Sequence, residues 1–139
     1  MSYTELRFNT VLVTGAAGFI GSNLIVSLLT KVDDIKIIGI DNLNDYYDVS
    51  LKKYRLDIIE KNSSENSWTF IEGNIADKNL VDKVFDEYKP DVVVNLAAQA
   101  GVRYSIDHPD AYIESNVIGF YNILEACRHS YDNGKNQAS

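Results

Sequence analysis

Three glycines near the start of the chain have the spacing of a phosphate-binding turn. Gly15, Gly18 and Gly21 recur at intervals of three, directly after an apolar run at residues 11–13. Glycines let the backbone turn tightly and approach a ligand where a Cβ would collide. A helix beginning behind them would aim its N-terminal N–H groups at the same gap, and such a helix start attracts a pyrophosphate. Most dinucleotide folds have G-x-G-x-x-G instead, so a turn without a ligand stays open at this point.

A carboxylate follows the next apolar run. Residues 35–40 have the composition of a strand, and Asp41 comes directly after them. A carboxylate at the tip of the second strand accepts both ribose hydroxyls of an adenosine and repels a 2′-phosphate. Asp41 could instead cap a loop beside Asn42. Taken together, the glycine turn and Asp41 favour a dinucleotide site, and NAD over NADP.

Strand-like and helix-like segments alternate along the chain, and they must position these groups. We predict strands at 11–14, 35–40, 68–72 and 91–96, and helices at 19–31, 48–61, 77–88 and 109–129. Alternating units imply parallel strands with helices on both faces. Right-handed crossovers and a glycine-rich first turn indicate the strand order 3-2-1-4. The predicted fold class is therefore α/β and Rossmann-like, with the cofactor across the carboxyl ends of strands one, two and four.

Apolar spacing also predicts which helix faces are buried. In the helix at 48–61, Leu51, Tyr54 and Ile58 recur at spacings of three and four, and the helix at 77–88 buries Leu80, Val81, Val84, Phe85 and Tyr88. In the helix at 109–129, one face carries Ile113, Val117, Phe120, Leu124 and Cys127. We interpret Lys52, Lys53 and Arg55 as a solvated helix face.

Charge and cysteine content limit the functions open to the chain. Its 139 residues suggest one domain with a real core, and its net charge of −7 disfavours nucleic acid and anionic membranes as partners. The single Cys127 excludes an internal disulfide and fits a reducing compartment, which favours the cytoplasm. No apolar run approaches the length of a membrane span. His108 and His129 have no metal-ligating partners at useful spacing.

The C-terminal residues predict an incomplete sheet. We divide the chain into a nucleotide-binding half-domain at 1–130 and a loop-like tail at 131–139. No fifth strand follows, whereas a doubly wound dinucleotide fold has about six strands in two halves. We therefore expect the chain to be the first part of a longer protein. The fourth strand would keep an unpaired edge, so we expect self-association through that edge or its covering by the tail.

Four segments carry a family resemblance. Residues 14–22, 41–48, 95–105 and 116–119 read TGAAGFIGS, DNLNDYYD, NLAAQAGVRYS and NVIG. The chain resembles the N-terminal part of the extended short-chain dehydrogenases/reductases, within them the nucleotide-sugar epimerases, and most of all the UDP-glucuronate 4-epimerases. The resemblance implies bound NAD, a UDP-sugar substrate, conversion of UDP-glucuronate to UDP-galacturonate through a 4-keto sugar, and a homodimer. A nucleotide-sugar 4,6-dehydratase fragment and a non-catalytic NAD-binding module stay open.

The resemblance also implies roles for particular residues. The pyrophosphate would contact Gly15, Gly18, Phe19, Ile20 and Gly21, and the adenosine ribose would contact Asp41, Asn42 and Asn44. Adenine would lie against Asn74 and Ile75, and the nicotinamide-side ribose would pass Leu96, Ala97, Ala98 and Gln99. Asn74 stands where most relatives have aspartate. Asn116 would support the catalytic centre, although a core amide is the alternative, and Arg103 would face the sugar or lie in a solvated loop.

The family's acid/base pair, Tyr-x-x-x-Lys, has one match in the chain, at Tyr131 and Lys135. We interpret this match as chance, because Asp132-Asn133-Gly134 between them is typical of a turn. The catalytic pair and the substrate domain are therefore expected outside this chain. On this interpretation the chain holds no catalytic residue and is inactive by itself.

Overall fold

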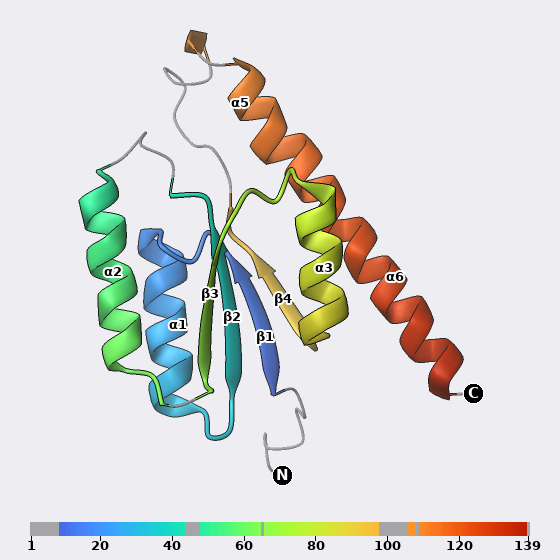
Figure 1. Ribbon diagram of the computed structural model, residues 1–139, viewed down its shortest axis with the longest axis horizontal. Helices are drawn as coiled ribbons and strands as arrows, with labels where there is room; N and C mark the ends of the chain where they lie inside the picture. The colour runs from blue at the N-terminus through green and yellow to red at the C-terminus, as the bar shows by residue number, and fades with distance from the viewer. Residues whose placement is uncertain (1–8, 44–47, 65, 98–105, 108, 139) are drawn as a thin grey trace.

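The computed structural model describes residues 9–43, 48–64, 66–97, 106–107 and 109–138, and its centre is a parallel β-sheet (Figure 1). The strands within this part of the chain are β1 (Thr10–Thr14), β2 (Lys36–Asp41), β3 (Trp68–Glu72) and β4 (Val92–Asn95). They are ordered β3-β2-β1-β4, and every pairing is parallel. The predicted strand order is confirmed, and the strand bounds agree with the predicted ones to within one residue.

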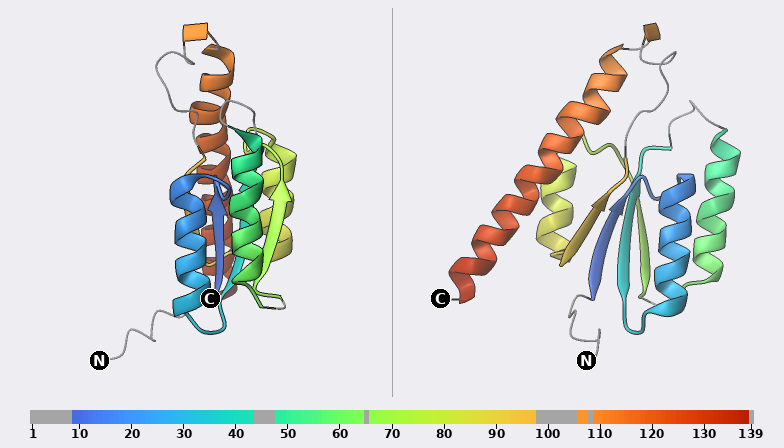
Figure 2. Two further views of the ribbon diagram at one scale, coloured as in Figure 1. Left: turned by 90° about the vertical axis from the view of Figure 1, so that its left-hand side faces the viewer. Right: turned by 180° about the vertical axis from the view of Figure 1, so that it is seen from behind.

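Helices cover both faces of the sheet, as Figures 1 and 2 show. On one face lie α1 (Phe19–Lys31) and α2 (Val49–Lys61), and on the other lie α3 (Lys78–Tyr88) and a long C-terminal helix. Leu12 of β1 belongs to the core under α3, while Val11 and Val13 belong to the core under α1 and α2. This alternation follows from the two-residue period of a strand, and it fixes which strand residues face each helix layer.

The long C-terminal helix has three parts. It consists of α5 (Pro109–Ile113), a π-helical turn η2 (Glu114–Gly119) and α6 (Phe120–Ala138). The predicted start at Pro109 is confirmed, but the predicted loop at 131–139 is wrong, because α6 continues to Ala138. Arg128 bridges Glu125 at 2.8 Å and Asp132 at 3.4 Å, which supports the helix across this boundary. One internal glycine costs only about 1 kcal/mol, so Gly134 does not end a long helix.

The buried face of this helix agrees with the predicted one only at Cys127, which packs against the core. Ile113, Val117, Phe120 and Leu124 are about half exposed, at 50%, 59%, 48% and 51%. The side turned to the sheet carries Gly119, Asn122, Ile123 and Ala126 instead. Gly119 shows the reason, since a Cβ there would lie 2.5 Å from Cγ1 of Ile75. Close approach to the turn after β3 requires small residues, which apolar spacing alone does not identify.

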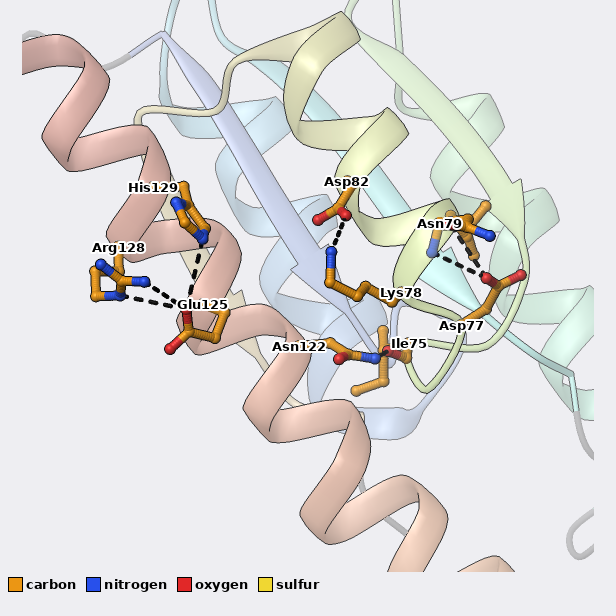
Figure 3. Close-up of polar contacts among 10 residues, drawn as sticks. Ile75, Asp77, Lys78, Asn79, Asp82, Asn122, Glu125, Arg128 and His129 are labelled. Atoms are coloured by element: carbon orange, nitrogen blue, oxygen red, sulfur yellow. Dashed lines mark hydrogen bonds and ion pairs between the residues drawn. The ribbon is translucent and has the colours of Figure 1, made fainter.

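A buried hydrogen bond holds α6 on the turn between β3 and α3. Asn122 is 7% exposed, and its Nδ2 donates to the carbonyl oxygen of Ile75 at 2.9 Å (Figure 3). The same turn leads into α3, whose first N–H groups are capped by Asp77, with Oδ1 accepting from the amide of Asn79 at 3.1 Å. The turn is therefore fixed from both helices on its side of the sheet.

Replacing Asn122 by alanine should lower the free energy of unfolding by about 1.5 kcal/mol, because the buried carbonyl of Ile75 loses its donor. Urea denaturation followed by circular dichroism measures this loss. Asn23→Ala is the matched control, since exposed Asn23 donates to the carbonyl of Phe19 within its own helix, and it should cost less than about 0.5 kcal/mol. Equal losses in both variants would contradict the role given to Asn122.

Within the described residues, β4 is an edge of the sheet, as its place in the strand order shows. The edge position itself was predicted and is confirmed. Self-association through this edge stays a prediction, which sedimentation of the purified chain can test. Among the described helices, none is long and apolar enough to cross a membrane.

Candidate functional site

The glycine turn lies at the carboxyl ends of β1, β2 and β4. Gly15 adopts φ +71°, and its amide donates to the carbonyl of Ile40 at the end of β2 at 2.8 Å. A Cβ on Gly15 would lie 2.7 Å from the carbonyl carbon of Leu96, just after β4. Both the left-handed conformation and this close approach require glycine. The turn therefore contacts the ends of both β2 and β4 as well as continuing β1.

The turn leads into a helix start suited to an anion. Gly18 is the N-cap of α1, and the first regular helical hydrogen bond runs from the amide of Ser22 to Gly18 at 2.9 Å. The amides of Phe19, Ile20 and Gly21 come before that bond, so they have no partner inside the helix. Together with the helix dipole, such amides bind a phosphate group. The backbone here fits a pyrophosphate.

Asp41 connects the second strand to the glycine turn. Its side chain is almost fully buried, and its Oδ2 accepts a hydrogen bond from the amide of Ala17 at 3.0 Å. Its Oδ1 accepts from the amide of Leu43 at 2.8 Å and lies 3.5 Å from Nζ of Lys52. A carboxylate offers roughly four acceptor positions, so these contacts leave room for a ribose hydroxyl. Asp41 thus lies beside the helix start whose backbone fits a pyrophosphate, at the end of the second strand. An acidic residue in that position binds the ribose in dinucleotide-binding folds.

The segment after β4 is tied to β1 through a threonine. The hydroxyl of Thr14 donates to Oδ1 of Asn95 and accepts from the amides of Leu96 at 3.0 Å and Ala97 at 3.1 Å. This pattern brings Leu96 and Ala97 beside Gly15. The other residues expected here, Ala98 and Gln99, lie outside the described residues, as do Asn44 and Arg103.

Asn74 and Ile75 have structural contacts of their own. The side chain of Ile75 is 3% exposed and belongs to the core, so only its backbone is available to a ligand. Oδ1 of Asn74 accepts from the amide of Ala76 at 2.9 Å, and its Nδ2 donates to Glu114 of η2 at 3.5 Å. Asn116 is half-buried in the same π-helical turn. Such turns are frequent at functional sites, which agrees with a supporting role for Asn116.

Two basic residues of α2 contact the site, contrary to the predicted solvated face. Lys52 is 8% exposed and pairs with Asp41, and Nη1 of Arg55 donates to the carbonyl of Ala17 at 3.3 Å. Only Lys53 is exposed as predicted. The spacing of three residues between Lys52 and Arg55 places both on one side of the helix that follows Asp41. That spacing is the signal in the sequence that could have identified them.

Tyr131 and Lys135 lie within α6, so the turn expected between them is absent. Figures 1 and 2 show this end of α6 extending away from the sheet at the level of the amino ends of the strands, whereas the glycine turn lies at their carboxyl ends. That these two residues match the Tyr-x-x-x-Lys pattern by chance stays a prediction. No three acidic, histidine or cysteine residues in the described part of the chain could hold a metal. Burial raises the pKa of the Cys127 thiol, which agrees with a core position rather than a reactive one.

A parallel sheet ordered 3-2-1-4, a glycine turn at the start of α1 and a carboxylate at the end of β2 define a Rossmann-like nucleotide-binding fold. The family model described as GDP-mannose 4,6 dehydratase matches residues 12–139, and the chain belongs to that family. This membership confirms the resemblance to NAD-dependent epimerases and dehydratases.

Individual relatives narrow the comparison to epimerases. Protein CapI of Staphylococcus aureus is 50% identical over 119 residues, which cover 86% of this chain and 34% of CapI. UDP-glucuronate 4-epimerase 2 of Arabidopsis thaliana is 46% identical over 120 residues, covering 86% of this chain and 26% of that protein. The UDP-glucuronic acid 4-epimerase of Bacillus cereus, solved in complex with UDP-glucuronic acid and NAD, has a TM-score of 0.71 and 33% identity, covering 86% and 36% of the two chains. The chain therefore spans about a third of the length of these relatives.

Proposed function

We propose that this chain binds NAD and forms the cofactor-binding part of a UDP-sugar 4-epimerase that converts UDP-glucuronate to UDP-galacturonate. The observation that carries the proposal is the contact between Asp41 and the glycine turn, through Oδ2 and the amide of Ala17 at 3.0 Å. This contact supports the proposal because it holds Asp41, which would accept the ribose, next to the amides that would receive the pyrophosphate. Similarity to the Bacillus cereus enzyme, solved with NAD, supports the cofactor.

Bound NAD would lie across the carboxyl ends of the central strands. The amides at Gly18 to Gly21 would bind its pyrophosphate. Asp41 and Asn42 would accept hydrogen bonds from the hydroxyls of the adenosine ribose, with Asn44 beside them. Asn74 and the backbone of Ile75 would border adenine, and residues 96–99 would follow the nicotinamide-side ribose. Arg103 would face the sugar, and Asn116 would support the reacting centre. NAD supplies reversible hydride transfer at C4 of the sugar.

The substrate proposal rests on the relatives. UDP-glucuronate 4-epimerases cover 86% of this chain at up to 46% identity. The second candidate is a nucleotide-sugar 4,6-dehydratase, which the description of the family model favours. A glucuronate has a carboxylate at C6 and no hydroxyl to eliminate there, so 4,6-dehydration is not open to that substrate. A non-catalytic NAD-binding module is the third candidate. Cytoplasmic location and a homodimer belong to the same proposal.

Calorimetric titration of the 139-residue chain with NAD tests the cofactor proposal. We expect saturable binding of NAD and weaker binding of NADP, because Asp41 repels a 2′-phosphate. No heat of binding at millimolar NAD, in a chain folded by circular dichroism, would contradict NAD binding by this chain and exclude the free-standing module.

The reaction is tested on a longer protein that contains this chain. Incubation with UDP-glucuronate should give UDP-galacturonate. Proton NMR distinguishes the product from the substrate by the coupling constants of the proton on C4. Incubation with UDP-glucose or GDP-mannose should give no 4-keto-6-deoxy sugar. Formation of that sugar instead would identify a dehydratase.

A further inference from the structure

Helix α2 directs a buried cation at the carboxylate of Asp41. Lys52 is 8% exposed, Asp41 is 7% exposed, and Nζ and Oδ1 lie 3.5 Å apart. The two residues come from different elements, since Asp41 ends β2 and Lys52 lies in the first turns of α2. Lys53, its neighbour in sequence, is exposed to solvent. Charges buried this deeply interact strongly and are weakly screened by salt.

The two oxygens of Asp41 have different surroundings. Oδ1 faces Lys52 and the amide of Leu43, whereas Oδ2 receives the amide of Ala17 in the glycine turn. Lys52 therefore attracts Oδ1, while Oδ2 is held by the hydrogen bond from the glycine turn. The ammonium also offsets part of the negative charge that Asp41 presents to a ligand. Arg55 acts nearby but on the carbonyl of Ala17, so it does not replace Lys52 at the carboxylate.

We propose that Lys52 is a positioning and specificity-determining residue: it orients the Asp41 carboxylate for the ribose and moderates its repulsion of a 2′-phosphate. This inference rests on the proposed function, in which Asp41 receives the adenosine ribose. Removing the Lys52 charge leaves a carboxylate whose negative charge is less compensated. Binding of a dinucleotide with a 2′-phosphate then weakens more than binding of one without it, since like charges placed together disfavour a complex.

Fluorescence titration with NADH and NADPH measures both affinities on the same chain. For Lys52→Met we expect about threefold weaker NADH binding from lost positioning and about thirtyfold weaker NADPH binding. The dissociation constant of NADPH divided by that of NADH then rises about tenfold, which corresponds to about 1.4 kcal/mol. Lys53→Met removes the same charge from an exposed position and should leave the ratio within about twofold of the wild type.

Two further variants separate charge from structure. Lys52→Arg keeps the charge and should restore the ratio to near the wild-type value. Asp41→Asn combined with Lys52→Met removes both charges, and its ratio should fall well below that of Lys52→Met alone. Neither the restored ratio in Lys52→Arg nor the lower ratio in the double variant is expected if Lys52 only supports packing.

Several results would overturn the inference. If Lys52→Met weakened NADH and NADPH binding equally, so that the ratio of their dissociation constants stayed unchanged, Lys52 would have a structural role only. If Lys52→Met loses its circular dichroism signal, Lys52→Gln carries the same test, and unfolding of both while Lys52→Arg stays folded would also assign a structural role. No NADH binding by the folded wild-type chain would overturn the proposed function and this inference together.

Discussion

Replacing Gly15 by alanine is expected to destabilise the chain by about 3 kcal/mol and to abolish measurable NAD binding. The left-handed conformation at φ +71° costs an alanine about 1–2 kcal/mol. The new Cβ would also lie 2.7 Å from the carbonyl carbon of Leu96, which must move at a further cost of about 1–3 kcal/mol. Any such movement displaces the turn together with the amides that would bind the pyrophosphate. Urea denaturation and calorimetry measure the two effects.

Gly18→Ala is the matched control within the same turn. Gly18 has φ −73°, which alanine adopts without strain, and its Cβ would lie 3.2 Å from the carbonyl oxygen of Gly15. The loss of stability should stay below about 1 kcal/mol, since replacing an N-cap glycine is a modest change. Equal losses at the two positions would show that neither the left-handed conformation nor the contact with Leu96 explains the requirement for glycine.

Replacing Asp41 by alanine is expected to cost about 3 kcal/mol of stability and to weaken NAD binding at least tenfold. The change removes the acceptor of two backbone amides, those of Ala17 and Leu43, and the carboxylate facing buried Lys52. Taking one partner from a buried pair is costly because the other charge stays in a region of low dielectric. Denaturation in urea and calorimetric titration with NAD give both values.

Asp57→Ala provides the comparison for this variant. Asp57 is an exposed carboxylate on α2, the helix that also carries Lys52. Its removal changes the net charge by the same amount and should shift stability by less than about 0.5 kcal/mol. If Asp41→Ala were as mild as Asp57→Ala, the buried carboxylate would not organise the site.

The helix faces show where prediction from sequence succeeds and where it fails. In α3 the apolar residues fall on one side only, and Val81, Val84 and Phe85 are buried as predicted. In α2 the buried residues are Lys52 and Ile59, while Leu51 and Tyr54 are 44% and 60% exposed. Large apolar residues occur on more than one side of α2 and α6, so spacing alone did not select the side that faces the sheet.

The amino-acid sequence by itself determined the strands, their order, the glycine turn and the position of Asp41. These follow from local causes: apolar runs of strand length, the backbone freedom of glycine and the handedness of crossover connections. Tertiary structure alone decided that Lys52 pairs with Asp41 and that Arg55 contacts Ala17. It also decided that the C-terminal helix packs on the turn after β3 through Gly119 of η2 and Asn122 of α6. Each of these contacts joins residues from separate elements. Their cost or benefit depends on how closely those elements approach and on the exclusion of water between them, which no local pattern records.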